Sequence, residues 1–232
     1  RAHNRDTLEV QNGDSLTVEY LVESYSPIIN RHFPCPLALV NFKTNCGELS
    51  QEHAVTDASG MASVSCVLSD VYNNPDSLFL TALILDKEGK AIDTDTLNMV
   101  PSRWVDLGLP SGILWAAYNV GATSPEEYGN YYAWAETSTK NNYTYDNYLY
   151  RSHDELDYKV INNISGTKYD AANKEWGDGA RIPTLSELTT LKTKCSWKIN
   201  SYNGIKGVTC TGPNGNSIFI PFSGIMEGSI AY

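Results

Sequence analysis

Residues 176–188 constrain the fold most, because they combine turn glycines, an arginine, a proline and a helix start within thirteen residues. The stretch reads Trp-Gly-Asp-Gly-Ala-Arg-Ile-Pro-Thr-Leu-Ser-Glu-Leu. Thr184 is typical of a helix N-cap, because its hydroxyl can accept from the backbone N–H of Glu187 while the Glu187 side chain reaches back in a capping box. The pattern predicts a helix over residues 185–194.

Several runs around this stretch carry a family resemblance. They are Val-Asp-Leu-Gly-Leu-Pro-Ser-Gly-Ile-Leu-Trp-Ala at 105–116, Asn-Val-Gly-Ala at 119–122, Pro-Glu-Glu-Tyr-Gly-Asn-Tyr-Tyr-Ala-Trp-Ala-Glu at 125–136, Cys-Ser-Trp at 195–197, and 212–221. Over residues 104–232 the chain resembles the Fibrobacter succinogenes major paralogous domain. The resemblance implies a variant of the C-type lectin-like fold in a surface or secreted protein of Bacteroides-like bacteria.

The resemblance does not imply a calcium-dependent sugar site, because the sequence contains no Glu-Pro-Asn or Trp-Asn-Asp triplet. We therefore interpret Trp176, Asp178, Arg181 and Pro183 as a structural motif. Asp178 is expected to bond turn amides, and Arg181 to fix the loop through backbone carbonyls or a carboxylate. Relatives in the family continue past Phe-Ile-Pro-Phe-Ser-Gly with further strands, so the resemblance implies either a second domain truncated at its C-terminus or one whose closing edge is supplied otherwise.

The first hundred residues read as short strands separated by turn residues, and residues 16–22 and 62–68 alternate apolar with polar side chains. Such alternation gives one buried and one wet face and predicts an all-β sandwich. Residues 56–64 and their surroundings resemble bacterial immunoglobulin-like domains of the invasin and intimin kind. The predicted strands are Leu8–Val10, Ser15–Val22, Leu37–Phe42, Ala62–Leu68, Leu78–Leu85 and Ala91–Asn98.

Aromatic and charged residues divide the chain in two. All five tryptophans follow residue 103, whereas residues 1–101 hold six Lys/Arg against fourteen Asp/Glu. We predict an immunoglobulin-like β-sandwich over residues 1–101 and an α+β lectin-like domain over residues 102–232. The predicted fold class is therefore mainly β with some α.

Tyrosines are the strongest sequence argument for a binding surface. Seven of the fifteen lie between residues 128 and 150. An aromatic face with a hydroxyl can stack on a sugar ring or fill a pocket on a partner. We take Tyr143, Tyr145, Tyr148 and Tyr150 as candidate ligand-binding residues, with packing beneath a long loop as the alternative. Three aromatic residues of the family-like segment are expected in the core: Tyr131, Tyr132 and Trp134.

Charge and motif content argue against several other functions. A net charge of −10 without a basic stripe is unsuited to binding a phosphate backbone, so we expect no nucleic-acid partner. The five cysteines and four histidines fit no metal-ligand spacing, and an acidic cluster of Asp86, Asp93 and Asp95 lacks the spacing of an EF-hand. We expect no metal and no cofactor. No nucleophile motif or cleft carboxylate pair is apparent, so we expect no enzymatic activity.

Cysteine usage leaves two states open for the second domain. Cys195 and Cys210 flank a predicted hairpin, where they could form a disulfide in an exported protein or remain buried thiols. An odd number of cysteines leaves at least one thiol free.

These patterns together give two hypotheses. In the first, the chain is a non-enzymatic, adhesin-like protein on the outer-membrane exterior or secreted, and its lectin-like domain recognises a glycan or a surface protein. In the second, it is a structural subunit of a surface fibre or envelope assembly with no soluble ligand. No apolar run approaches the roughly 20 residues of a spanning helix, so any membrane attachment is expected through a lipid anchor outside this segment.

Overall fold

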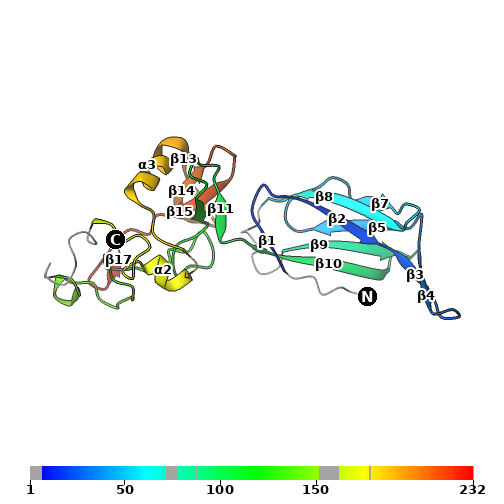
Figure 1. Cartoon of the computed structure of the whole chain (residues 1–232), viewed down its shortest axis with the longest axis horizontal. Helices are drawn as coiled ribbons and strands as arrows, with labels where there is room; N and C mark the ends of the chain where they lie inside the picture. Colours follow the sequence, from blue (N-terminus) through cyan, green and yellow to red (C-terminus); the bar gives the residue numbers. More distant parts are fainter. Residues whose placement is uncertain are drawn as a thin grey trace. The chain divides into compact units, whose positions relative to one another are not determined.

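The computed structural model describes residues 7–69, 71, 78–86, 88–151, 162–177 and 179–231 of the 232-residue chain. The chain divides into two compact units, Arg1–Ser102 and Arg103–Tyr232, called unit 1 and unit 2 below. The described elements are mostly strands with few helices, which confirms the predicted class of a mainly β protein with some α (Figure 1).

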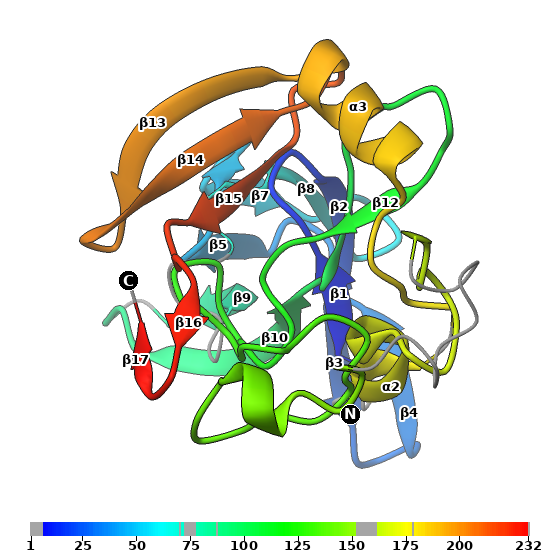
Figure 2. The ribbon, with the colours of Figure 1, turned by 90° about the vertical axis from the view of Figure 1, so that its left-hand side faces the viewer.

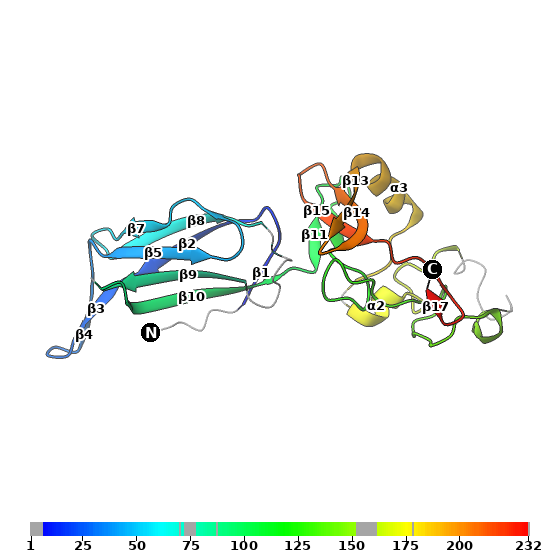
Figure 3. The ribbon, with the colours of Figure 1, turned by 180° about the vertical axis from the view of Figure 1, so that it is seen from behind.

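Unit 1 contains two main sheets whose strands run side by side (Figure 3). The larger sheet has the order β1 (Leu8–Val10), β10 (Ala91–Pro101), β9 (Leu78–Leu85), β5 (Leu39–Thr44), β7 (His53–Val55). The smaller sheet has the order β2 (Ser15–Leu21), β8 (Met61–Val67), β6 (Glu48–Leu49). Only the pairing of β1 with β10 is parallel among these strand pairs of the described residues.

Alternating side chains build the core of unit 1. In β8 the side chains of Ala62, Val64 and Cys66 are buried, and the residues between them are partly or fully exposed. The same period of two runs through β9, where Leu78 and Leu80 are buried. Because each fully buried aliphatic side chain contributes roughly 1.5–3 kcal/mol, this alternation is what holds the two sheets together as a sandwich.

One polar contact also joins the two sheets, between the buried Tyr20 and the exposed Asp93. The Tyr20 hydroxyl of β2 donates to Asp93 Oδ2 of β10 at 2.8 Å. Burial, reinforced by that carboxylate, raises the pKa of Tyr20 above its ordinary value. Asp93 therefore makes a structural contact between the two sheets.

A two-stranded hairpin, β3 (Glu23–Ser26) and β4 (Arg31–Pro34), was not predicted. It carries no apolar alternation, and its turn exposes 92% of Ile28. The predicted start of the next strand at Leu37 was wrong, because Leu37 lies in a turn with φ 62° and 83% of its surface exposed. β5 begins at Leu39, where the backbone becomes extended and joins β7 and β9.

Unit 2 is built around a three-stranded antiparallel sheet and a helix that leads into it (Figure 2). Helix α3 spans Leu185–Lys194 with the Thr184–Glu187 capping box, as predicted. The sheet follows as β13 (Ser196–Tyr202), β14 (Ile205–Thr211) and β15 (Ser217–Pro221). The turns at Asn203–Gly204 and at residues 212–216 join these strands, and the first of these lies in the hairpin predicted between Cys195 and Cys210.

Short elements complete unit 2. The turn before β15 is tied to the beginning of the unit, because the Asn214 and Asn216 side-chain amides each donate to the Asp106 carbonyl at 2.9 Å. The remaining elements are β11 (Trp104–Asp106), β12 (Leu114–Ala116), the 3₁₀ helix η1 (Tyr145–Asn147), α2 (Ala171–Trp176), β16 (Met226–Glu227) and β17 (Ile230–Ala231).

Gly47 offers a test of how tightly the sandwich closes. Its φ of +94° suits glycine, and an added Cβ would lie 2.1 Å from the Val67 carbonyl oxygen. We expect Gly47→Ala to lower the free energy of unfolding of unit 1 by about 2–4 kcal/mol, because strain and a backbone clash add. Far-UV circular dichroism during urea unfolding measures this loss.

Gly89→Ala is the matched control, since Gly89 has φ +81° and no atom within 4 Å of the added Cβ. Gly89→Ala should lower the free energy of unfolding only by the strain of a left-handed alanine, about 1 kcal/mol. Tryptophan fluorescence reports unit 2 alone and should be unchanged in both variants. Equal losses for the two glycines would contradict the close approach at Gly47.

Candidate functional site

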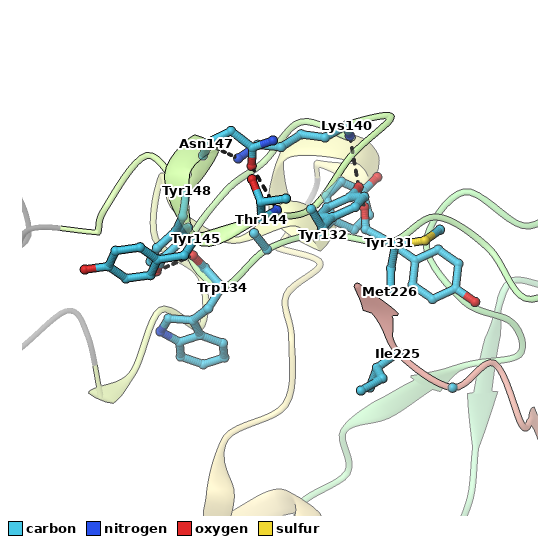
Figure 4. A pocket seen from close by; sticks show the side chains of 13 residues that line it. Tyr131, Tyr132, Trp134, Lys140, Thr144, Tyr145, Asn147, Tyr148, Ile225 and Met226 are labelled. Atoms are coloured by element: carbon cyan, nitrogen blue, oxygen red, sulfur yellow. Dashed lines mark hydrogen bonds between the residues drawn. The ribbon is translucent and has the colours of Figure 1, made fainter. Parts of the chain in front are cut away.

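The tyrosine-rich segment of unit 2 forms one wall of a pocket of about 500 Å³, called the aromatic pocket below. Figure 4 shows its side chains, with Ile225 and Met226 of the later chain opposite the tyrosine loop. The aromatic lining consists of Tyr131, Tyr132, Trp134, Tyr143, Tyr145 and Tyr148. Its polar lining comes from Lys140, Thr144 and Asn147. A pocket of this size and composition suits a small ligand with both apolar faces and hydroxyl groups.

The four tyrosines predicted from the sequence to bind a ligand do not all line the same pocket. Tyr143, Tyr145 and Tyr148 line the aromatic pocket. Tyr150 instead packs edge-on between Tyr148 and Tyr169, with ring centroids 6.1 and 5.7 Å away. The structure thus gives Tyr150 the packing role that was the alternative, because its ring supports the wall from behind.

Two of the pocket tyrosines are held by their hydroxyl groups. The Tyr143 hydroxyl donates to the Tyr131 carbonyl and accepts from the Lys140 backbone N–H. The Tyr148 hydroxyl donates to the Trp134 carbonyl at 3.0 Å, and burial, aided by the charge of Glu136, raises the pKa of Tyr148. These rings are rigid parts of the wall.

Tyr145 and Trp134 are the exposed rings of the aromatic pocket. Tyr145 is 73% exposed, and its hydroxyl makes a long 3.3 Å bond to the Arg151 carbonyl. Trp134 is 49% exposed, so the expectation that it lies in the core was wrong. Ala135 turns inward with φ 65° and 2% exposure, which directs the preceding tryptophan outward. Both residues expose part of their surface at the aromatic pocket.

A buried ion pair holds the pocket loop. Glu136 is 3% exposed, and its two oxygens lie 2.7 and 2.6 Å from Lys140 Nζ. Lys140 Nζ also donates to the Asn147 carbonyl, and Glu136 accepts from the Leu149 backbone N–H at 2.8 Å. One carboxylate therefore fixes both ends of residues 140–149. The sequence offered no periodic signal for this, because Lys140 reads as one polar residue in a polar stretch.

The segment opposite the loop is held by backbone hydrogen bonds. Tyr143 and Gly228 exchange both of their N–H···O bonds as an isolated bridge. The Tyr131 hydroxyl donates to the Ser223 carbonyl. Residues 224–226 are thereby kept against the tyrosines, although more than seventy residues separate them in sequence.

The structural motif occupies a different part of unit 2. Trp176 ends α2 and packs edge-on against Trp104 and Tyr118, while the Arg103 guanidinium lies 5.1 Å from its ring centroid. Pro183 directly precedes the N-cap of α3. Asp178 lies outside the described residues.

Arg181 has a carboxylate partner and a backbone partner. Its guanidinium donates to both Glu187 oxygens at 2.8 and 2.6 Å, to Ser165 Oγ at 3.0 Å and to the Ile182 carbonyl. The bidentate bond from Arg181 lowers the pKa of Glu187 to about 2. Arg181 thus ties the loop before α3 to the first turn of that helix.

Sequence reasoning missed Asp170, which is completely buried. Its carboxylate accepts from the backbone N–H groups of Ala172 and Asn173 at the start of α2, and from those of Gly166 and Ile182. An aspartate immediately before Ala-Ala-Asn-Lys-Glu is an N-cap signal that could have been recognised.

All five cysteines are free thiols. Cys195 and Cys210 are both buried, and burial together with a hydrogen bond between the two thiols raises the pKa of Cys210 to about 12. The structure therefore contains the buried-thiol alternative rather than the disulfide.

Among the described residues, no group of three or more His, Cys, Asp and Glu side chains is arranged to hold a metal ion. Asp86, one of the candidate cluster, accepts from the Glu88 and Lys90 backbone N–H groups of its own turn. Within the same residues, no helix has both the length and the apolar character required to cross a bilayer.

The Glu136–Lys140 ion pair predicts that removing the charge of Glu136 strongly destabilises unit 2. Glu136→Gln should lower the free energy of unfolding of unit 2 by about 2–4 kcal/mol, because it leaves the Lys140 ammonium without its counter-charge. Urea unfolding followed by tryptophan fluorescence measures the loss. The double variant Glu136→Gln/Lys140→Met should recover part of it, and a double variant less stable than the single one would refute this account.

Glu187 predicts a pH dependence. Its folded pKa of about 2 lies below the ordinary 4.5, so the pair with Arg181 stabilises unit 2 above pH 4.5 and loses this contribution as the pH falls toward 2. The deficit of Glu187→Gln should be about 1–3 kcal/mol at pH 7 and should shrink steadily below pH 4.5. Glu175→Gln, a change on an exposed residue, is the control; a deficit independent of pH would exclude the ion pair as its cause.

Comparison with known proteins gave one weak structural similarity. No family model matches the sequence, and no curated protein matches it. The resemblance to the major paralogous domain therefore stays a prediction. Among solved structures, the chain is similar to the C-terminal 282-residue fragment of intimin, solved with the intimin-binding domain of the translocated intimin receptor. The similarity has 14% identity and a TM-score of 0.30 over 97% of this chain and 95% of that one.

Proposed function

We propose that the chain is a non-enzymatic, adhesin-like surface protein whose second unit binds a glycan in the aromatic pocket. One observation carries this proposal: two exposed rings, Tyr145 and Trp134, line one concavity together with the Thr144 hydroxyl and the Asn147 amide. Aromatic faces stack on the C–H faces of sugars, and hydroxyl or amide groups bond sugar hydroxyls.

The rigidity of the wall supports the proposal. Tyr143 and Tyr148 are fixed by their hydroxyl groups, and Glu136 fixes the loop that carries them. A preformed wall lowers the entropic cost of binding a flexible ligand such as an oligosaccharide. We accordingly assign unit 2 as a lectin-like domain of the paralogous family, displayed on the outer-membrane exterior or secreted, and unit 1 as its immunoglobulin-like spacer.

Exposure of the rings separates this proposal from the structural-subunit hypothesis. Rings facing solvent around a concavity favour ligand binding, whereas rings buried under the loop would favour assembly. Tyr145 and Trp134 have the first arrangement, whereas Tyr150 is half-buried and packs between Tyr148 and Tyr169. The exposed rings around the concavity therefore favour ligand binding over the structural-subunit hypothesis.

The test is a glycan-array screen of the full chain, followed by titration of the best-binding glycan. Tyr145→Ala should weaken binding about 10-fold or more, since truncating a central aromatic contact commonly costs over 1 kcal/mol. Tyr145 makes one weak hydrogen bond, so the variant should remain folded. Tyr128→Ala is the matched control, because Tyr128 is 46% exposed in the same unit and does not line the pocket.

The same titration with a metal chelator added tests whether glycan binding needs a metal ion. We expect the glycan affinity to be unchanged by the chelator. Binding that disappears with the chelator would overturn the metal-free pocket. If no glycan binds the folded chain, or if Tyr128→Ala and Tyr145→Ala weaken binding equally, the glycan proposal fails and the structural-subunit hypothesis gains.

A further inference from the structure

Strand β13 forms an open edge of the three-stranded sheet of unit 2. The strand order is β13-β14-β15, and among the described residues no strand pairs with the outer side of β13 (Figure 2). At seven residues, Ser196–Tyr202, this edge is long enough to template a further strand. No residue of β13 lines the aromatic pocket, so the edge is separate from the proposed glycan site.

The turn after β13 determines which of its backbone groups face outward. Asn203–Gly204 is a two-residue loop after Tyr202, and both loop residues have positive φ, 47° and 81°. The residues that flank such a loop bond to each other, and pairs along the ladder then alternate between bonded and non-bonded. Ser201 and Lys206 are thus a non-bonded pair, and the Lys206 carbonyl accepts from the Phe222 N–H on the far side instead. The outward N–H and C=O groups of β13 belong to Trp197, Ile199 and Ser201.

Apolar surface accompanies these outward backbone groups. Trp197 and Ile199 lie on the same face of the sheet, because side chains alternate along a strand. Ile199 is 77% exposed and Trp197 is 41% exposed. Lys198 lies between them on the opposite face and is exposed. An added strand would therefore meet apolar side chains on one face and an ammonium group on the other.

Positive charge gathers near this edge in an otherwise acidic chain. Residues 188–226 contain four lysines and no aspartate or glutamate, although the whole chain carries a net charge of −10. The indole N–H of Trp197 donates to the Lys192 carbonyl at 3.3 Å, which holds the last turn of α3 against β13. All four lysines are exposed and none belongs to the ion pairs of the described residues: Lys192, Lys194, Lys198 and Lys206.

These charges discriminate between possible partners. A lysine on an edge strand opposes pairing with a basic strand, and two copies of β13 placed edge to edge would bring their lysines together. A strand with carboxylates would instead pair with them. The edge is therefore complementary to an acidic strand and unfavourable for itself.

We infer that β13 binds an extended segment of an acidic partner protein as a fourth strand of this sheet. Apolar side chains at every second position of the segment lie beside Trp197 and Ile199, and carboxylates at the intervening positions lie beside Lys198. Main-chain bonds to the outward groups supply affinity, and the alternation of side chains supplies specificity. This inference does not depend on glycan binding in the aromatic pocket.

Synthetic peptides test the strand addition on the full ¹⁵N-labelled chain. The acidic probe is acetyl-Thr-Val-Glu-Val-Glu-Val-Thr-amide. It should shift the amide cross-peaks of Trp197, Ile199 and Ser201 downfield, because their N–H groups gain acceptors. The same peptide with lysine in place of both glutamates should bind about 10-fold more weakly or worse. N-methylation of the central valine keeps the charge but removes a main-chain bond, and it should weaken binding by a similar factor.

Two pairs of variants locate the site. Ser201→Pro removes an outward N–H that β14 does not use, so unit 2 should stay folded while binding falls about 10-fold or more. Ser201→Ala keeps that N–H and should bind like the parent chain. Lys198→Glu should weaken binding of the acidic peptide about 5- to 10-fold and strengthen binding of the lysine peptide. Lys174→Glu makes the same charge change at an exposed residue of α2 and should alter neither affinity. Dispersed amide spectra establish that each variant is folded.

Other results would overturn the inference. They are the absence of shifts along β13 at millimolar acidic peptide, equal affinities of the acidic and lysine peptides, and unchanged binding in Ser201→Pro. Concentration-dependent broadening of the Ile199 cross-peak without peptide, removed by Ser201→Pro, would assign the edge to a second copy of the chain instead. Failure of glycan binding with intact peptide binding would refute only the proposed function.

Discussion

Four backbone amides converge on the buried carboxylate of Asp170, and the arrangement of unit 2 depends on that convergence. Two of the amides begin α2, one belongs to Gly166 and one to Ile182. A buried carboxylate must find such donors or destabilise the fold, so these segments have one arrangement that satisfies it. The same carboxylate thereby sets α2, which carries Trp176, and the chain that leads through Arg181 into α3. Tyr169, which supports Tyr150, precedes it directly.

Local physics made part of this architecture predictable. Period-two burial in β2, β8 and β9 and the capping box of α3 depend on neighbours in sequence, and those elements were identified from the residues alone. The β3–β4 hairpin lacks that signal, and Leu37 adopts a conformation that no propensity favours. Unit 2 was predicted less completely, because its short elements are held by distant partners such as the amides of Asn214 and Asn216 on Asp106.

The candidate site was predicted from the local abundance of tyrosines, and the structure then changed which aromatic residues are assigned to it. A cluster of tyrosines predicted a binding loop, and three of the four predicted tyrosines line a pocket whose binding role stays a prediction. Clustering in sequence cannot distinguish a ring that lines a cavity from one that packs behind its wall. Trp134 faces outward because Ala135 takes the inward position, and that choice depends on a left-handed backbone at an alanine. Ile225 and Met226 could not have been assigned, since the contacts that hold them there join residues far apart in sequence: the Tyr143–Gly228 bridge and the bond from the Tyr131 hydroxyl to the Ser223 carbonyl.

The buried thiols have a consequence for the chemistry of the intact chain. Cys46 and Cys66 are buried in unit 1 and Cys195 and Cys210 in unit 2, and burial raises the pKa of Cys46, Cys66 and Cys210. The thiolate is the reactive species, so these groups resist alkylation while the fold is closed. Modification of the buried cysteines therefore reports the opening of each unit separately. Its rate equals the rate at which that unit opens when reclosing is slow, and it follows the opening equilibrium when reclosing is fast.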